Sequence, residues 1–146
     1  RRLYQAIVVN IALWGSESWA LKEADRSKLE AFHHGCLRKM CGLTMWDVAE
    51  KRIKNEHVRG MVANSTTMDT LMETRRCRWL SKLSAMKESR SPRRILGAWC
   101  TTPRPVGRPQ QTIRHAYIST LKKLGFEGEK GQLREWMTVA RDRQAW

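Results

Sequence analysis

Long apolar runs are missing from this 146-residue sequence, so no stretch reaches the ~20 apolar residues of a membrane-spanning helix. Cysteine is scarce, with four residues, which argues against a secreted scaffold held by disulfides. Acidic residues number 14 against 28 Lys and Arg, which leaves a net charge of +14. We therefore expect an intracellular protein, nuclear or cytoplasmic, that binds a polyanion and no membrane. The chain opens on Arg1-Arg2 without Met, and we expect a piece of a longer protein.

Catalytic motifs are also missing. Polymerases and two-metal nucleases hold divalent ions with clustered carboxylates, but no two acidic residues are adjacent here. The sequence has no glycine-rich phosphate loop, and no Ser, Cys or Lys lies in an activating pattern. We therefore expect no catalytic residue, no cofactor and no small-molecule substrate, so that this chain by itself is not an enzyme.

A zinc site is the nearest approach to a metal motif. Cys36 and Cys41 are five residues apart and close to His33, but Cys77 and Cys100 lie far away and supply no second close pair. Structural zinc sites usually combine two closely spaced ligand pairs. We interpret the cysteines as small core residues and expect no metal.

Helical spacing of apolar residues dominates the chain, and no segment shows the alternation of a strand. The spacing predicts an apolar, buried helix over 2–14, amphipathic helices over 22–41 and 67–87, and two helices after residue 111. Asn55 is expected to cap a short helix that ends near residue 63. The fold class is therefore predicted to be all-α, with about five or six helices.

Punctuation residues predict where these helices end. Gly15, Gly42 and Gly125 each follow an apolar periodic segment and are expected to end its helix, with Gly42 as a C-terminal cap. Residues 43–54 are predicted to be a connector between two helices.

Prolines and glycines gather in one place, which predicts a linker. Three of the four prolines and two glycines fall within 97–111, where they prevent a helix and favour extended backbone. Two small helical parts would then be joined by a linker containing Pro, Gly and Arg. The predicted divisions are 1–63, 64–96, 97–111 and 112–146.

Positive charge is concentrated in the middle of the chain, because residues 66–110 carry half of the net charge. Arginine supplies most of it, and its planar fork pairs with phosphate bidentately. We interpret this region as a phosphate-binding surface, although a solvated helix face of a basic protein is the alternative. The predicted nucleic-acid-binding residues are Arg75, Arg76, Arg78, Lys82, Arg93, Arg94, Arg104 and Arg108.

Seven tryptophans are many for a chain of this length. Trp14, Trp79 and Trp136 fit apolar stripes and are predicted to lie in the core. Trp19, Trp46 and Trp99 fall at helix ends or connectors, where they either bury a corner or offer stacking platforms for bases. We favour the first role for these three.

Several short motifs follow one another along the chain. They are Leu-Trp-Gly-Ser-Glu-Ser-Trp-Ala-Leu at 13–21, Leu-Glu-Ala-Phe-His at 29–33, Cys-Leu-Arg at 36–38, Asn-Glu-His-Val at 55–58, Arg-Cys-Arg-Trp-Leu at 76–80, Gly-Arg-Pro-Gln-Gln-Thr at 107–112 and Asp-Arg-Gln-Ala-Trp at 142–146. Together these motifs resemble the C-terminal part of reverse transcriptases of non-LTR, LINE-type retrotransposons. Their order and spacing agree with that family over nearly the whole chain.

The resemblance implies the thumb and post-thumb region of an RNA-directed DNA polymerase, with 1–63 as the thumb-like part. Its role would be to hold template RNA, primer DNA or their hybrid. Catalysis would belong to the palm and fingers upstream in the same polyprotein, which would also be its protein partner. The alternative is a stand-alone basic helical module that binds DNA or another protein.

Overall fold

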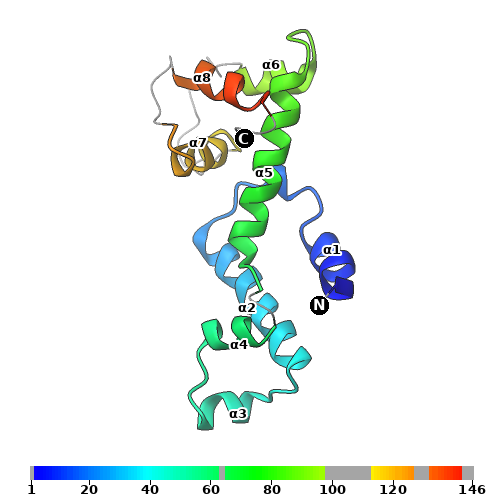
Figure 1. The fold of residues 1–146 in the computed structure, drawn as a ribbon, viewed down its shortest axis with the longest axis vertical. Coiled ribbons are helices and arrows are strands. Elements are labelled where there is room, and N and C mark those ends of the chain that lie inside the picture. The colour runs from blue at the N-terminus through cyan, green and yellow to red at the C-terminus, as the bar shows by residue number, and fades with distance from the viewer. Residues whose placement is uncertain (1, 63–64, 98–112, 127–131, 143–146) are drawn as a thin grey trace, which may run out of the picture. The chain divides into compact units, whose positions relative to one another are not determined.

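The structure is a computed structural model of the chain and describes residues 2–62, 65–97, 113–126 and 132–142. Every regular element within these ranges is a helix (Figure 1), which confirms the predicted all-α fold class. In chain order the elements are the π-helix η1 (Tyr4–Val9), α1 (Asn10–Ala12), the 3₁₀ turn η2 (Ser16–Ser18), α2 (Glu23–Met40), α3 (Met45–Glu50), α4 (Asn55–Met61), α5 (Met68–Ala85), α6 (Ser91–Gly97), α7 (Ile113–Lys123) and α8 (Gln132–Val139).

Helix α3 was not expected, because its residues were predicted to form a connector. A capping box at its N-terminus explains the difference. Thr44 Oγ1 accepts a hydrogen bond from the backbone N–H of Asp47 (3.2 Å), and Asp47 Oδ2 accepts one from the backbone N–H of Thr44 (2.9 Å). Reciprocal capping satisfies two backbone donors and stabilises a short helix that has no apolar stripe.

The structure confirms the helix ends predicted from glycines but not the helix start predicted from Asn55. Gly15, Gly42 and Gly125 have φ angles of +67°, +69° and +90°. These left-handed conformations agree with the predicted helix ends. The prediction that Asn55 caps α4 is wrong, since Asn55 is the first helical residue and follows Lys54. Its side-chain oxygen instead accepts a hydrogen bond from Arg38 (2.6 Å), so a tertiary contact replaces the local cap.

The chain divides into two compact units. The first comprises Arg1–Trp14 and Leu21–Met72, and the second comprises Gly15–Ala20 and Glu73–Trp146. Helix α5 begins in the first unit and continues in the second. The predicted linker at 97–111 lies outside the described residues, apart from Gly97 at the end of α6.

A small apolar cluster forms the core of the first unit. Leu37 of α2 packs with Val58 of α4 and with Val62 directly after it. Only part of the predicted apolar stripe of α2 faces this cluster, because Phe32 and Met40 are exposed.

Two adjacent histidines are buried in the first unit, and His33 links three separate segments. Its Nε2 lies 3.1 Å from the carbonyl oxygen of Thr66, which can only accept, so this nitrogen carries the proton. In the neutral ring Nδ1 is then an acceptor, and the hydroxyl of Tyr4 donates to it over 2.8 Å. The imidazole thus joins η1, α2 and the segment before α5.

His34 lies in a second group of polar contacts on the same helix. An Arg59 nitrogen is 3.1 Å from His34 Nε2 and 3.9 Å from Oε1 of Glu30. The other carboxylate oxygen of Glu30 accepts from the backbone N–H of Met68 (2.8 Å), the first residue of α5. A carboxylate at a helix N-terminus is favourable because it faces unpaired N–H groups and the positive end of the dipole.

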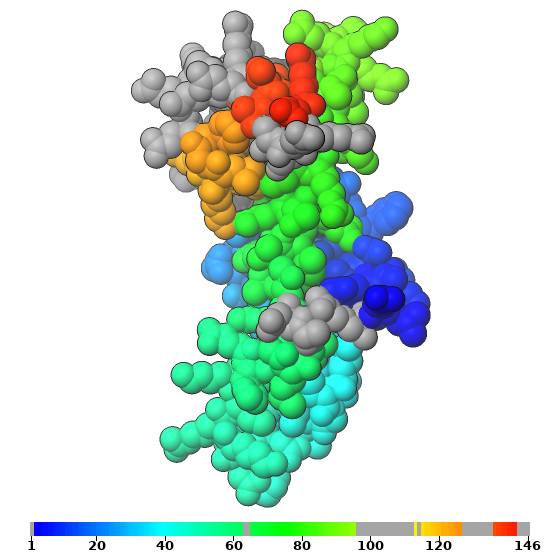
Figure 2. Space-filling view, in the orientation of Figure 1, coloured from blue at the N-terminus to red at the C-terminus, as the bar shows by residue number. Residues whose placement is uncertain are grey.

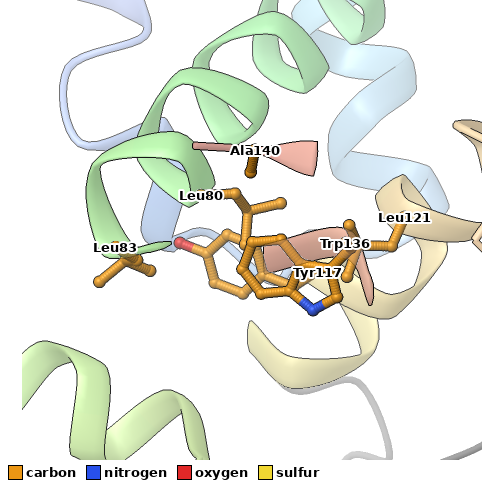
Figure 3. Packing of buried hydrophobic residues seen from close by; sticks show 6 residues of the cluster. All are labelled: Leu80, Leu83, Tyr117, Leu121, Trp136 and Ala140. Atoms are coloured by element: carbon orange, nitrogen blue, oxygen red, sulfur yellow. The ribbon is translucent and has the colours of Figure 1, made fainter. Parts of the chain in front are cut away.

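The core of the second unit joins α5, α7 and α8. Leu80 and Leu83 of α5 meet Tyr117 and Leu121 of α7, and Trp136 of α8 and Ala140 complete the cluster. Figure 3 shows the Trp136 and Tyr117 rings together beneath Leu80. In the space-filling view, α7 and α8 lie against the second half of α5 (Figure 2).

The N-terminal helix is less buried than its composition predicted. Val9 and Leu13 are buried, but Leu3, Ile7, Ile11 and Trp14 are exposed. The segment is apolar on more than one side, and the described residues cover one side only. Trp14 is 82% exposed, so its predicted place in the core is wrong, whereas Trp136 is 2% exposed and its prediction is confirmed. Among the described helices, none is long and apolar enough to span a bilayer.

The buried histidines predict a stability that falls in acid. Burial lowers the pKa of His33 and of His34 below the usual 6.5, with the Glu30 carboxylate opposing the shift. Because the folded state binds protons less readily at these histidines than the unfolded state does, the fold keeps its full stability only while the pH stays above the unfolded-state pKa of about 6.5. Below that pH the unfolded state is favoured by protonation, and the free energy of unfolding falls. Urea unfolding followed by circular dichroism should therefore give a smaller free energy of unfolding at pH 5 than at pH 7.

Matched variants separate this effect from other titrations. Replacing His33 and His34 together by Gln should flatten the pH dependence between pH 5 and 7. His57→Gln, at an exposed position, should leave it intact. Equal pH dependence in the double variant and the parent would contradict the assignment.

Candidate nucleic-acid interface

The structure describes six of the eight residues predicted to contact nucleic acid, and it sorts them into two groups. Arg104 and Arg108 lie outside the described residues. The exposed or half-buried group comprises Arg75, Arg78, Lys82 and Arg94, and the group engaged in main-chain contacts comprises Arg76 and Arg93.

Three basic residues form a stripe along α5 within the second unit. Arg75, Arg78 and Lys82 are separated by three and four positions, so they share one face of the helix and span about 10 Å. Arg78 and Lys82 are exposed, and Arg75 is half-buried. We call these three residues the α5 basic stripe.

Carboxylates are sparse around this stripe. No acidic residue occurs between Glu73 and Glu88 in the sequence. Glu73 is bound by Lys123 of α7, and Glu88 lies 3.6 Å from Arg93. Within the described part of the chain, neither Arg78 nor Lys82 forms an ion pair, so both cations face solvent with their charge uncompensated.

Arg76 has a different place from the one predicted, although it neighbours Arg75 in sequence. Its side chain points about 100° away from Arg75 around the helix axis and is 3% exposed. One guanidinium nitrogen donates to the carbonyl oxygen of Trp19 over 3.0 Å. Burial raises the pKa of Tyr117 to about 12, with the Arg76 charge acting in the opposite direction. Arg76 therefore belongs to the interior of the second unit and not to an exposed surface.

Arg93 is likewise part of the fold. Its guanidinium donates to the carbonyl oxygens of Ser84 (2.7 Å), Met86 (2.7 Å) and Leu83 (3.4 Å) at the C-terminal end of α5. Arg141 donates to the same Ser84 oxygen over 3.1 Å. A cation is favourable here because the last carbonyls of a helix are unpaired and carry the negative end of the dipole.

Further cations lie near the end of α5. Arg94 of α6 is exposed, and so are Lys87 and Arg90, which the prediction had not included. Arg90 and Arg94 are four positions apart, and the backbone N–H of Arg94 donates to the Arg90 carbonyl over 3.0 Å. Their helical spacing, visible in the sequence, was the available signal that they share a face.

Metal binding finds no support among the described residues. Across the described ranges, no three His, Cys, Asp or Glu side chains lie close enough together to hold a metal ion. The side chains that are available for ligands are cations, whose direct chemical capacity is to bind anions.

The described residues thus define a basic, all-α protein with a row of cations on one helix. The chain is 24% identical over 148 residues to an uncharacterised transposon-derived protein of Caenorhabditis elegans, covering 99% of this chain and 51% of that protein. It therefore spans about half the length of this relative. No protein-family model and no solved structure matches the chain. The likeness is consistent with a transposon origin.

The two classes of arginine predict losses of stability of different size. Arg76→Ala removes a buried side chain that donates to the Trp19 carbonyl and should lower the free energy of unfolding by about 1–3 kcal/mol. Arg78→Ala, two positions away and exposed, should change it by less than about 0.5 kcal/mol. Urea titration of both variants measures the difference, and equal losses would show that burial does not distinguish them.

Proposed function

We propose that this chain is a nucleic-acid-binding region of a non-LTR retrotransposon reverse transcriptase, where it holds template RNA, primer DNA or their hybrid. Two findings support the proposal: the ordered family motifs, and the likeness to a transposon-derived protein. In this proposal the catalytic palm lies elsewhere in the parent polyprotein. This chain supplies binding, and no chemistry.

The α5 basic stripe is the observation that carries the proposal. Phosphate contacts dominate the affinity of proteins for nucleic acids, because each neutralised phosphate releases condensed counterions. Arg78 and Lys82 present uncompensated charge on a helix whose opposite side is anchored by Leu80 and Leu83. Anchoring keeps the cations in a fixed row, so little order has to be imposed on binding.

Such a surface favours backbone contacts over base readout. Arginine and lysine that face phosphates fix the position of the duplex or hybrid but carry no sequence information. A polymerase must hold every template sequence that passes through it, and this requirement fits a surface of that kind.

A stand-alone basic helical module remains the alternative function. The same stripe would serve a DNA-binding module, so nucleic-acid binding itself does not separate the two. The discriminating observation is genomic: an upstream reading frame that encodes an aromatic-x-Asp-Asp motif supports the polymerase, and an independent start codon supports the module.

The exposed N-terminal stripe bears on this choice. Leu3, Ile7, Ile11 and Trp14 present large apolar side chains to solvent, and a contiguous patch of this kind marks an interface. We assign it to the upstream polymerase region of the parent polyprotein, since the covalent connection keeps that region close.

Ile11→Glu tests this assignment. In the isolated chain it should alter the free energy of unfolding by less than about 0.5 kcal/mol, because Ile11 is exposed. In the parent polyprotein it should expose this region to limited proteolysis, because it places a charge in the interface. Equal protease resistance of parent and variant polyproteins would exclude the contact.

Salt dependence tests the binding function. Replacing Arg75, Arg78 and Lys82 together by Ala should weaken binding to duplex DNA and to an RNA–DNA hybrid for all sequences alike. On duplex DNA the slope of log affinity against log salt should flatten by up to about 3, since each phosphate contributes about 0.9. Fluorescence anisotropy across a salt series gives the slope.

A charge-matched control accompanies this test. The triple variant Arg2→Ala, Lys22→Ala and Lys28→Ala also removes three exposed positive charges and should leave the slope close to that of the parent. Circular dichroism verifies that both variants remain helical. The proposal fails if the unsubstituted chain does not bind nucleic acid, or if the two triple variants show equal slopes.

A further inference from the structure

Residues 41–54 of the first unit form an excursion between α2 and α4, which we call the α3 excursion (Figure 1). Its residues 43–54 were predicted to be a connector, and none of the predicted binding residues lies in it. The structure makes it an ordered element that presents a large aromatic side chain to solvent.

Contacts at its base fix the excursion to the first unit. Arg38, near the end of α2, donates to the Asn55 side chain at the start of α4 over 2.6 Å. Leu43 and Ile53, at the two ends of the excursion, both pack against the Leu37 cluster. The two chain segments at the base of the excursion are therefore held together by one polar and two apolar contacts.

Both ends of α3 are also closed. The capping box of Thr44 and Asp47 fixes its N-terminus. After its last turn, Arg52 adopts a left-handed conformation with φ of +46°, and the backbone N–H of Ile53 donates to the Val48 carbonyl over 3.1 Å. An isolated helix of six residues is unstable in water, so these contacts hold its shape.

The helix presents Trp46 to solvent. The Trp46 side chain is 70% exposed, which contradicts its predicted role of burying a corner. Its neighbour Met45 is also exposed. An indole is the largest apolar surface that a side chain can leave in water. Because α3 is capped and anchored, this exposed indole is held in place and is available to contact a ligand.

Charge indicates which ligand the site fits. Exposed cations flank α3 on both sides: Lys39 before it, and Lys51, Arg52 and Lys54 after it. Lys51 lies 3.9 Å from Asp47, whereas no carboxylate of the described residues pairs with the other three. Glu50 and Glu56 are the exposed acids of this region. Long side chains of the α3–α4 region project from the surface in Figure 2.

We propose that the α3 excursion binds single-stranded nucleic acid, with the Trp46 indole stacked on an unpaired base and Arg52, Lys39 and Lys54 neutralising backbone phosphates. Aromatic stacking combined with a basic surround is the general mode of single-strand recognition. The inference rests on the proposed function and deepens it, because it assigns the unpaired strand to the first unit and paired nucleic acid to the α5 basic stripe.

Stacking predicts a loss that depends on strandedness. Trp46→Ala should weaken binding of a fluorescent 12-nucleotide single strand by roughly 5- to 100-fold, the range seen when a stacked aromatic is removed. Binding of a blunt duplex of the same sequence should change by less than about twofold, since a duplex offers no unpaired base. Trp46→Phe, which keeps an aromatic face, should restore most of the single-strand affinity.

Controls identify the cause of any loss. Phe32→Ala removes another exposed aromatic side chain of the same unit and should leave single-strand affinity unchanged. Circular dichroism of all variants should show equal helicity, because both residues are exposed. Intrinsic fluorescence gives a direct readout: the part of the signal that disappears in Trp46→Phe should be quenched by the single strand in the parent.

The outcomes distinguish this inference from the proposed function. If the parent binds neither single strand nor duplex, the proposed function fails and the inference fails with it. If the parent binds the single strand and Trp46→Ala binds it equally well, the function stands and the inference is wrong, which leaves the indole to a protein partner. Equal losses on single strand and duplex would also overturn base stacking.

Discussion

The guanidinium of Arg93 closes the C-terminus of α5 by donating to three main-chain carbonyls, and Arg141 adds a fourth hydrogen bond at the same place. These contacts satisfy acceptors that a helix end leaves unpaired. They also set the point at which the chain leaves α5 for α6. Because Leu80 and Leu83 anchor the same helix to α7 and α8, one side of α5 is fixed and the other is free to carry ligand contacts.

A strongly basic chain has to divide its cations between folding and binding. Arg76 and Arg78 show this division two positions apart, because Arg76 is buried and donates to a main-chain carbonyl, whereas Arg78 faces solvent. Composition and charge density do not distinguish these two arginines. Their different directions around the helix axis do. A positively charged sequence segment is therefore a coarse guide to a binding surface, and the burial of each side chain refines it.

The sequence predicted the features that depend on local patterns. Apolar periodicity located α2 and α5. Glycines marked three helix ends, because few other residue types adopt the left-handed conformation found there. It failed where tertiary contacts decide. Asn55 bonds Arg38 instead of capping a helix, and α3 forms from a capping box without an apolar stripe. For the candidate site, the basic segment stays a prediction, but the structure places Arg76 and Arg93 against main-chain carbonyls, and such acceptors cannot be read from sequence.

The central claim is that the exposed Arg78 of α5 contacts nucleic acid, whereas Arg76 of α5 and Arg93 of α6 maintain the fold. Footprinting with an arginine-selective dicarbonyl reagent, read by mass spectrometry with and without an RNA–DNA hybrid, tests both halves at once. The account predicts that Arg78 reacts in the free protein and is protected by the hybrid, whereas Arg76 and Arg93 react slowly in both states. Reaction of Arg78 at the same rate with and without the hybrid, or fast reaction of Arg76 in the folded protein, would contradict it.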